Sequence, residues 1–150
     1  MLILFGIPVA QILLFGFVIT NELRNVKIAV WDMSKDHVTT EITHKIVSSG
    51  FFTLEKNINR KEEIEEILKQ GDVREVIIFE RDFAKKLKKE KIADMQIITD
   101  ASDANSANMM LTYTQGIISD YLAKQNENIK SPMKINTKER MLYNESLKDV

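Results

Sequence analysis

The chain has 150 residues, enough for one ordinary domain, and its formal net charge of -1 gives no general attraction to nucleic acid or acidic surfaces. It has no cysteine, which excludes disulfides, thiolate metal sites and cysteine nucleophiles; many exported proteins also lack disulfides, so the redox compartment stays open. His37 and His44 leave little material for a metal site, and both read as ordinary surface histidines.

The first 20 residues carry no charged side chain and match the roughly 20 residues that a helix needs to cross a bilayer. We therefore expect a transmembrane helix over residues 1–20 and an α/β domain over 21–150. A cleaved signal peptide is the competing interpretation, but no basic segment precedes the apolar run and no small-residue cleavage site follows it. A signal-anchor and a buried core helix are the remaining alternatives. The same absence of a basic segment before Met1 suggests a piece of a longer membrane protein, and the mixed charges after the span do not fix its orientation.

After Asn21, short apolar runs of strand length alternate with segments of helical periodicity. The expected strands are 26–32, 51–58, 74–80, 94–100 and 133–143. The expected helices lie between them, within 33–50, 59–71 and 81–93 and over about 106–125.

The order β-α-β-α-β-α-β-α-β predicts an α/β domain of three layers, with helices on both faces of a mostly parallel, mixed sheet. The last strand has one polar face and is a candidate for an antiparallel edge. Helix caps are expected at Ser34 or Asp36, at Asn59, which Glu62 follows at capping-box spacing, and at Asp103 or Asn105.

Asp32, Asp100 and Asp103 are the best candidate cleft for a small ligand or metal, because ligands bind beyond the carboxyl ends of strands in open parallel sheets. The competing and preferred interpretation is that these acids begin helices. The chain has no phosphate-binding loop, dinucleotide fingerprint or nucleophile elbow, so we assign no catalytic residue, cofactor or metal ligand.

Lysines gather in the segment 81–93, but acidic neighbours and the lack of interleaved aromatics favour a solvated face over nucleic-acid binding. Anionic lipid headgroups are a more plausible contact, because a predicted span lies on the same chain. The candidate partner surface combines two tyrosines of the long helix with three of these lysines: Tyr113, Tyr121, Lys85, Lys88 and Lys89.

Taken in order, several short motifs resemble one family. They are "LLFGFVIT", "NVKIAVWDMS", "SSGFF", "LKQGDVREVIIFERDFAKKL", "TDASDANSAN" with Tyr113 on the helix that follows, and "ERMLYNESL". Together they resemble the first membrane helix and extracytoplasmic domain of type-2 ABC exporter permeases, a group that includes multidrug-efflux-like bacterial transporters. Ala101 stands where that family usually has glycine, and Glu145 where it usually has proline.

The resemblance implies a non-catalytic domain outside the bacterial cytoplasmic membrane, leading towards a second span. It implies a permease that pairs with a second permease copy and with separate ATP-binding subunits to export a small molecule or lipid-like substrate. In some systems a membrane-fusion protein contacts the domain. The alternative is a membrane-anchored sensor that binds a ligand or metal at Asp32, Asp100 and Asp103.

Overall fold

The computed structural model describes residues 6–12, 25–127 and 129–143. Along the chain the elements are β1 (Val26–Asp32), α2 (His37–Ser48), β2 (Phe52–Asn57), α3 (Glu62–Lys69), β3 (Glu75–Phe79), α4 (Phe83–Lys89), β4 (Ile92–Asp100), α5 (Ala104–Asn126) and β5 (Lys134–Leu142). The α/β class is as expected from the sequence.

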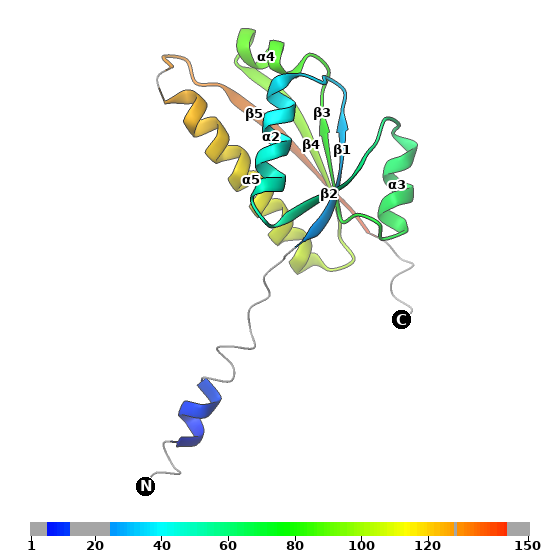
Figure 1. The fold of residues 1–150 in the computed structure, drawn as a ribbon, viewed down its shortest axis with the longest axis vertical. Coiled ribbons are helices and arrows are strands. Elements are labelled where there is room, and N and C mark those ends of the chain that lie inside the picture. The colour runs from blue at the N-terminus through cyan, green and yellow to red at the C-terminus, as the bar shows by residue number, and fades with distance from the viewer. Residues whose placement is uncertain (1–5, 13–24, 128, 144–150) are drawn as a thin grey trace.

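The strands form one five-stranded sheet in the order β2-β1-β3-β4-β5 (Figure 1). β1 pairs in parallel with β2 and β3, β3 pairs antiparallel with β4, and β4 pairs in parallel with β5. The sheet is therefore mixed, and the reversal lies at β3–β4 rather than at the edge pair where we expected it. β5 is an edge strand that runs opposite to β1, but it does so because β4 has already reversed.

Helices cover the two faces of the sheet unequally (Figure 1). One hydrophobic cluster joins the sheet to α2, α4 and α5, while a smaller one joins the opposite face to α3 alone. Alternate residues of β1 divide accordingly, with Ile28 and Val30 in the first cluster and Ala29 in the second. Because α3 is short, it leaves part of its face, above β4 and β5, without a covering helix.

The predicted membrane helix over residues 1–20 lies mostly outside the described residues, and its described part, 6–12, is helical. Within 6–12, 25–127 and 129–143, no helix is both long and apolar enough to cross a membrane.

The helix caps agree with the sequence at two of three positions. Asp36 caps α2 and Asp103 caps α5, where Asn105 is the N–H donor rather than the cap. The prediction for Asn59 is wrong: α3 begins only at Glu62, and the cap position, Lys61, makes no side-chain hydrogen bond. Asn59 is instead an exposed residue of the connection that precedes the helix.

Candidate functional site

Of the three acids that were expected to form one cleft, Asp32 lies at the opposite end of the sheet from Asp100 and Asp103. Asp32 at the end of β1 is level with Phe79, whereas Asp100 follows the Glu75–Thr99 pair at the other end of β3. Four residue steps along β3 amount to about 13 Å. The predicted cleft is therefore wrong. Because β3 and β4 are antiparallel, the C-terminal end of β4 lies at the end of the sheet opposite to the C-terminal end of β1.

Each of these carboxylates organises its own turn instead. Asp32 accepts hydrogen bonds from the backbone N–H groups of Ser34 (2.9 Å) and Lys35 (2.8 Å). Asp100 accepts from the Ser102 N–H (2.9 Å) and hydroxyl (2.6 Å). Across the described parts of the chain, no group of three His, Cys, Asp or Glu residues could hold a metal ion. The geometry does not bring Asp32, Asp100 and Asp103 together, as the sensor alternative requires.

Asp36 connects two helices at the end of the domain where β1 and β3 finish. Its Oδ1 accepts from the N–H groups of Val38 (2.9 Å) and Thr39 (3.0 Å) at the start of α2. Its Oδ2 accepts from the Ala84 N–H (2.9 Å) at the start of α4, as well as from the Ser34 hydroxyl. One carboxylate therefore caps the first turns of two helices.

The sequence could not reveal the second half of this role, because Ala84 lies 48 positions from Asp36. Asp82, which precedes α4, has a left-handed backbone (φ 56°) and makes no side-chain cap bond. Burial raises the pKa of Asp36, but hydrogen bonds from Ser34, Ala84, Thr39 and Val38 outweigh it and hold the pKa below its usual value.

The predicted partner surface does not exist as one patch. Tyr121 is buried, and its hydroxyl donates to Glu41 at 3.2 Å; burial, reinforced by Glu41, raises the pKa of Tyr121 to about 12. Tyr113 stacks on Phe51 with ring centroids 4.3 Å apart, at the end of the domain where β2 begins. The exposed lysines of α4 lie at the opposite end (Figure 1): Lys85, Lys88 and Lys89.

Glu75 is a buried carboxyl group that sequence reasoning missed. It is fully buried between β3 and α5, and its Oε1 accepts a 2.6 Å hydrogen bond from the Thr114 hydroxyl. Its Oε2 and the hydroxyl of Thr99, the cross-strand neighbour, have no partner among the described residues. Burial raises the pKa of Glu75 to about 7, although the bond from Thr114 opposes the shift.

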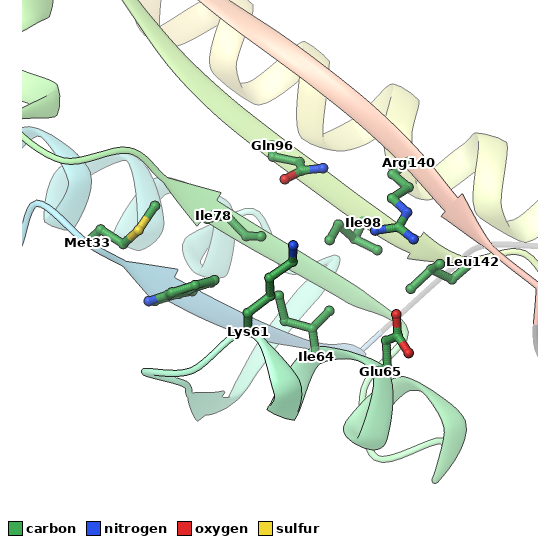
Figure 2. Close-up of a pocket in the computed structure, with 10 residues that line it drawn as sticks. Met33, Lys61, Ile64, Glu65, Ile78, Gln96, Ile98, Arg140 and Leu142 are labelled. Carbon is green, nitrogen blue, oxygen red and sulfur yellow. The ribbon is translucent and has the colours of Figure 1, made fainter.

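A groove of about 220 Å³ lies where α3 leaves the sheet uncovered (Figure 2). Its floor comes from β3 and β4, its walls from α3 on one side and β5 on the other. Figure 2 shows the side chains that line it: Trp31, Met33, Lys61, Ile64, Glu65, Ile78, Gln96, Ile98, Arg140 and Leu142. We call this the α3 groove.

The start of β1 and the end of β5, where the chain enters and leaves the domain, lie at the same end of the sheet. Backbone hydrogen bonds run from Arg74 to Lys27 (2.9 Å), from Asp100 to Arg74 (2.9 Å) and from Ala101 to Leu142 (2.8 Å). These bonds cross from β1 through β3 and β4 to β5, so the chain enters and leaves the domain within three strand spacings, or about 14 Å. α4 lies at the far end (Figure 1).

Comparison with known proteins identifies the family of this chain. The model of the ABC-2 family transporter proteins matches residues 1–149, and the chain therefore belongs to that family, whose members are membrane-embedded permeases of ABC transporters. The resemblance inferred from the sequence motifs is confirmed.

Particular relatives include two proteins of Escherichia coli. The chain is 28% identical over 134 residues to the probable multidrug ABC transporter permease YbhR, covering 89% of this chain and 36% of YbhR. It is 26% identical over 112 residues to the probable multidrug ABC transporter permease YbhS, covering 74% of this chain and 29% of YbhS. The chain thus spans about a third of the length of these relatives.

A solved structure supports the fold. A domain of a putative ABC type-2 transporter from Thermotoga maritima aligns with a TM-score of 0.58 at 15% sequence identity, over 77% of this chain and 86% of that one.

Proposed function

We propose that residues 25–143 form the extracytoplasmic domain of an ABC exporter permease, placed between the span predicted at 1–20 and a second span that follows. The observation that carries this proposal is that the chain enters and leaves the domain at the same end of the sheet. A domain inserted between two membrane helices needs its entry and exit on the side that faces the bilayer. A separation of about 14 Å exceeds the 8–10 Å between packed helices by about 4–6 Å, which about two extended residues can bridge, so two neighbouring spans could receive both ends.

The domain would be a non-catalytic, rigid part of the transporter. The carboxylates of Asp32, Asp36 and Asp103 are all hydrogen-bonded in turns and caps, which gives each a structural role. ATP hydrolysis would belong to separate ATP-binding subunits, and a second permease copy would complete the membrane pathway. The cargo would be a small molecule or lipid-like substrate; YbhR and YbhS are themselves named as probable multidrug permeases.

The far end of the domain is where a periplasmic partner would dock, such as a membrane-fusion protein. The exposed lysines of α4 lie there, away from the edge where the chain enters and leaves: Lys85, Lys88 and Lys89. Ile92 (45% exposed) and Ile129 (39% exposed) flank β4 and β5 at the same end. An apolar centre with cations around it would suit a partner with an acidic surface.

The orientation can be tested with fluorophores at the two ends of the domain. Single cysteines would replace Asp72, in the loop before β3, and Lys88 on α4, in the chain reconstituted in nanodiscs whose lipids carry nitroxide quenchers. We expect strong quenching at position 72 and little at position 88. Equal quenching at both positions, or stronger quenching at position 88, would show that the end of the domain where β1 starts does not face the membrane.

A further inference from the structure

We propose that the α3 groove binds a small amphiphilic anion from solution: a compact apolar body with a carboxylate, sulfonate or phosphate head. The physiological role of such a ligand, as cargo or as a signal of cargo, rests on the proposed function. Binding itself does not, because it depends only on side chains of the described domain.

The floor of the groove is already formed and mostly apolar, with Gln96 of β4 as its polar member. Ile78 and Ile98 are 7% and 3% exposed and present their side chains between α3 and β5. Ile64 is buried on the α3 side, and Trp31, the one tryptophan of the chain, closes another side. A volume of about 220 Å³ with this lining suits a short alkyl chain or a single ring system.

Two cations face this floor without a partner. Lys61 reaches over it from the start of α3 and Arg140 from β5, on opposite sides (Figure 2). Within the described parts of the chain, neither makes an ion pair or a side-chain hydrogen bond. Two residues before Arg140 on the same face of β5, Lys138 is instead paired with Asp94 at 2.5 Å.

The net charge of the lining residues determines which charge the ligand should carry. Glu65 is the one acidic residue among the lining side chains, against Lys61 and Arg140, so the groove carries a net positive charge. An arginine fork binds carboxylate or phosphate through two hydrogen bonds, while the apolar floor takes the remainder of the ligand. A second copy of the chain fits less well, since a two-fold contact through this face would bring four cations together with only two carboxylates.

The test uses the chain of residues 1–150 in phosphatidylcholine nanodiscs and follows Trp31 fluorescence. Octanoate is the probe, and octyltrimethylammonium, with the same alkyl length and opposite charge, is its matched control. We expect a saturable fluorescence change with octanoate and none with the cation over the same concentrations. Repeating the titration with phosphatidylglycerol in the discs separates a dissolved anion from an anionic lipid.

Substitution then assigns the head group site. Arg140→Gln should weaken octanoate binding about tenfold, the size of effect expected for losing a charged hydrogen-bonding partner. Lys134→Gln removes a cation from the same face of β5 outside the groove and should leave the affinity unchanged. Circular dichroism of both variants checks that the fold is retained.

Several outcomes would overturn the inference. Equal responses to octanoate and the cation would show an unselective apolar surface, and equal effects of Arg140→Gln and Lys134→Gln would remove the head group site. Phosphatidylglycerol that abolishes the octanoate response would assign the groove to lipid. A Trp31 signal that depends on protein concentration and not on octanoate would assign it to a second copy. None of these results bears on the orientation test of the proposed function.

Discussion

Replacing the buried Glu75 by glutamine should change how the stability of the domain depends on pH. Glutamine has nearly the same shape and can still accept the hydrogen bond from the Thr114 hydroxyl, but it cannot ionise. In the native domain, burial raises the pKa of Glu75 from 4.5 to about 7. In the unfolded chain the carboxyl group should titrate near its ordinary value.

The sign of the effect follows from proton binding. Between pH 4.5 and about 7 the folded domain holds a proton at Glu75 that the unfolded chain releases, so stability falls as pH rises. At about 1.4 kcal/mol per pKa unit, the contribution lost across this window is about 3 kcal/mol. Below pH 4.5 both states are protonated and the effect disappears.

Urea unfolding, followed by Trp31 fluorescence at pH 4.5, 6 and 8, measures this difference. We expect Glu75→Gln to have nearly wild-type stability at pH 4.5 and to exceed wild type by roughly 2–3 kcal/mol at pH 8. Glu66→Gln, which alters an exposed carboxylate on α3, should keep the wild-type pH profile. A Glu75→Gln variant whose stability falls with pH as steeply as wild type would refute the reasoning.

Five further substitutions, at four positions, test the roles of the helix caps and of the Tyr121 hydrogen bond. Asp36→Ala should lower the free energy of unfolding by about 2 kcal/mol, since two helices each lose a cap worth about 1 kcal/mol. A loss no larger than that of a single cap would show that the hydrogen bond from Ala84 contributes nothing. Hydrogen bonds lower the pKa of Asp36, so the contribution of its carboxylate to stability should be present above pH 3.8 and fade as the pH falls below that value. Acid unfolding of Asp36→Asn, compared with wild type, would measure this loss. Asn59→Ala should be nearly neutral in thermal unfolding while Asp103→Ala lowers the midpoint, and the reverse order would restore Asn59 as a cap. Tyr121→Phe should cost about 1 kcal/mol in urea unfolding through loss of the bond to Glu41, and an unchanged midpoint would show that water replaces it.

The individual elements could be predicted because their signals are local. The apolar run of β1, the stripe of α5 and the cap of α2 at Asp36 each depend on residues a few positions apart. Bounds shifted by a few residues: α5 begins at Ala104 rather than about 106, and β4 at Ile92 rather than 94. Such shifts did not affect the class of the fold.

The direction of β4 could not be predicted, because an intervening helix is compatible with either parallel or antiparallel return. The error in the acidic cleft followed directly, since Asp32 and Asp100 meet only if their strands run the same way. The register shift between Ile28 and Ala29 in the β1–β2 pair could not be predicted from the sequence either. After this shift Ile58 lies in the cluster on the α3 face, whereas Phe52, six positions earlier, lies in the cluster on the other face.

The functional features missed by the sequence all depend on distant partners. Glu75 gave no periodic signal that distinguishes it from a surface acid at the start of a strand, yet Thr114 and Thr99 enclose it. The α3 groove arises because α3 is too short to cover β4 and β5, which depends on the strand order. In contrast, the family could be inferred from ordered short motifs, since those motifs do not require the sheet topology to be known.

The central claim, that this domain stands outside the cytoplasmic membrane, is tested most directly by one labelling measurement. This chain contains no cysteine, so Lys88→Cys introduces the single thiol of the domain. The substitution would be made in the full-length permease that we propose contains this chain, with any cysteine outside residues 1–150 replaced by serine. Intact cells would be treated with a membrane-impermeant maleimide, with permeabilised cells as the control. Labelling of intact cells is the result that the account predicts. Labelling only after permeabilisation would place the domain in the cytoplasm and contradict it.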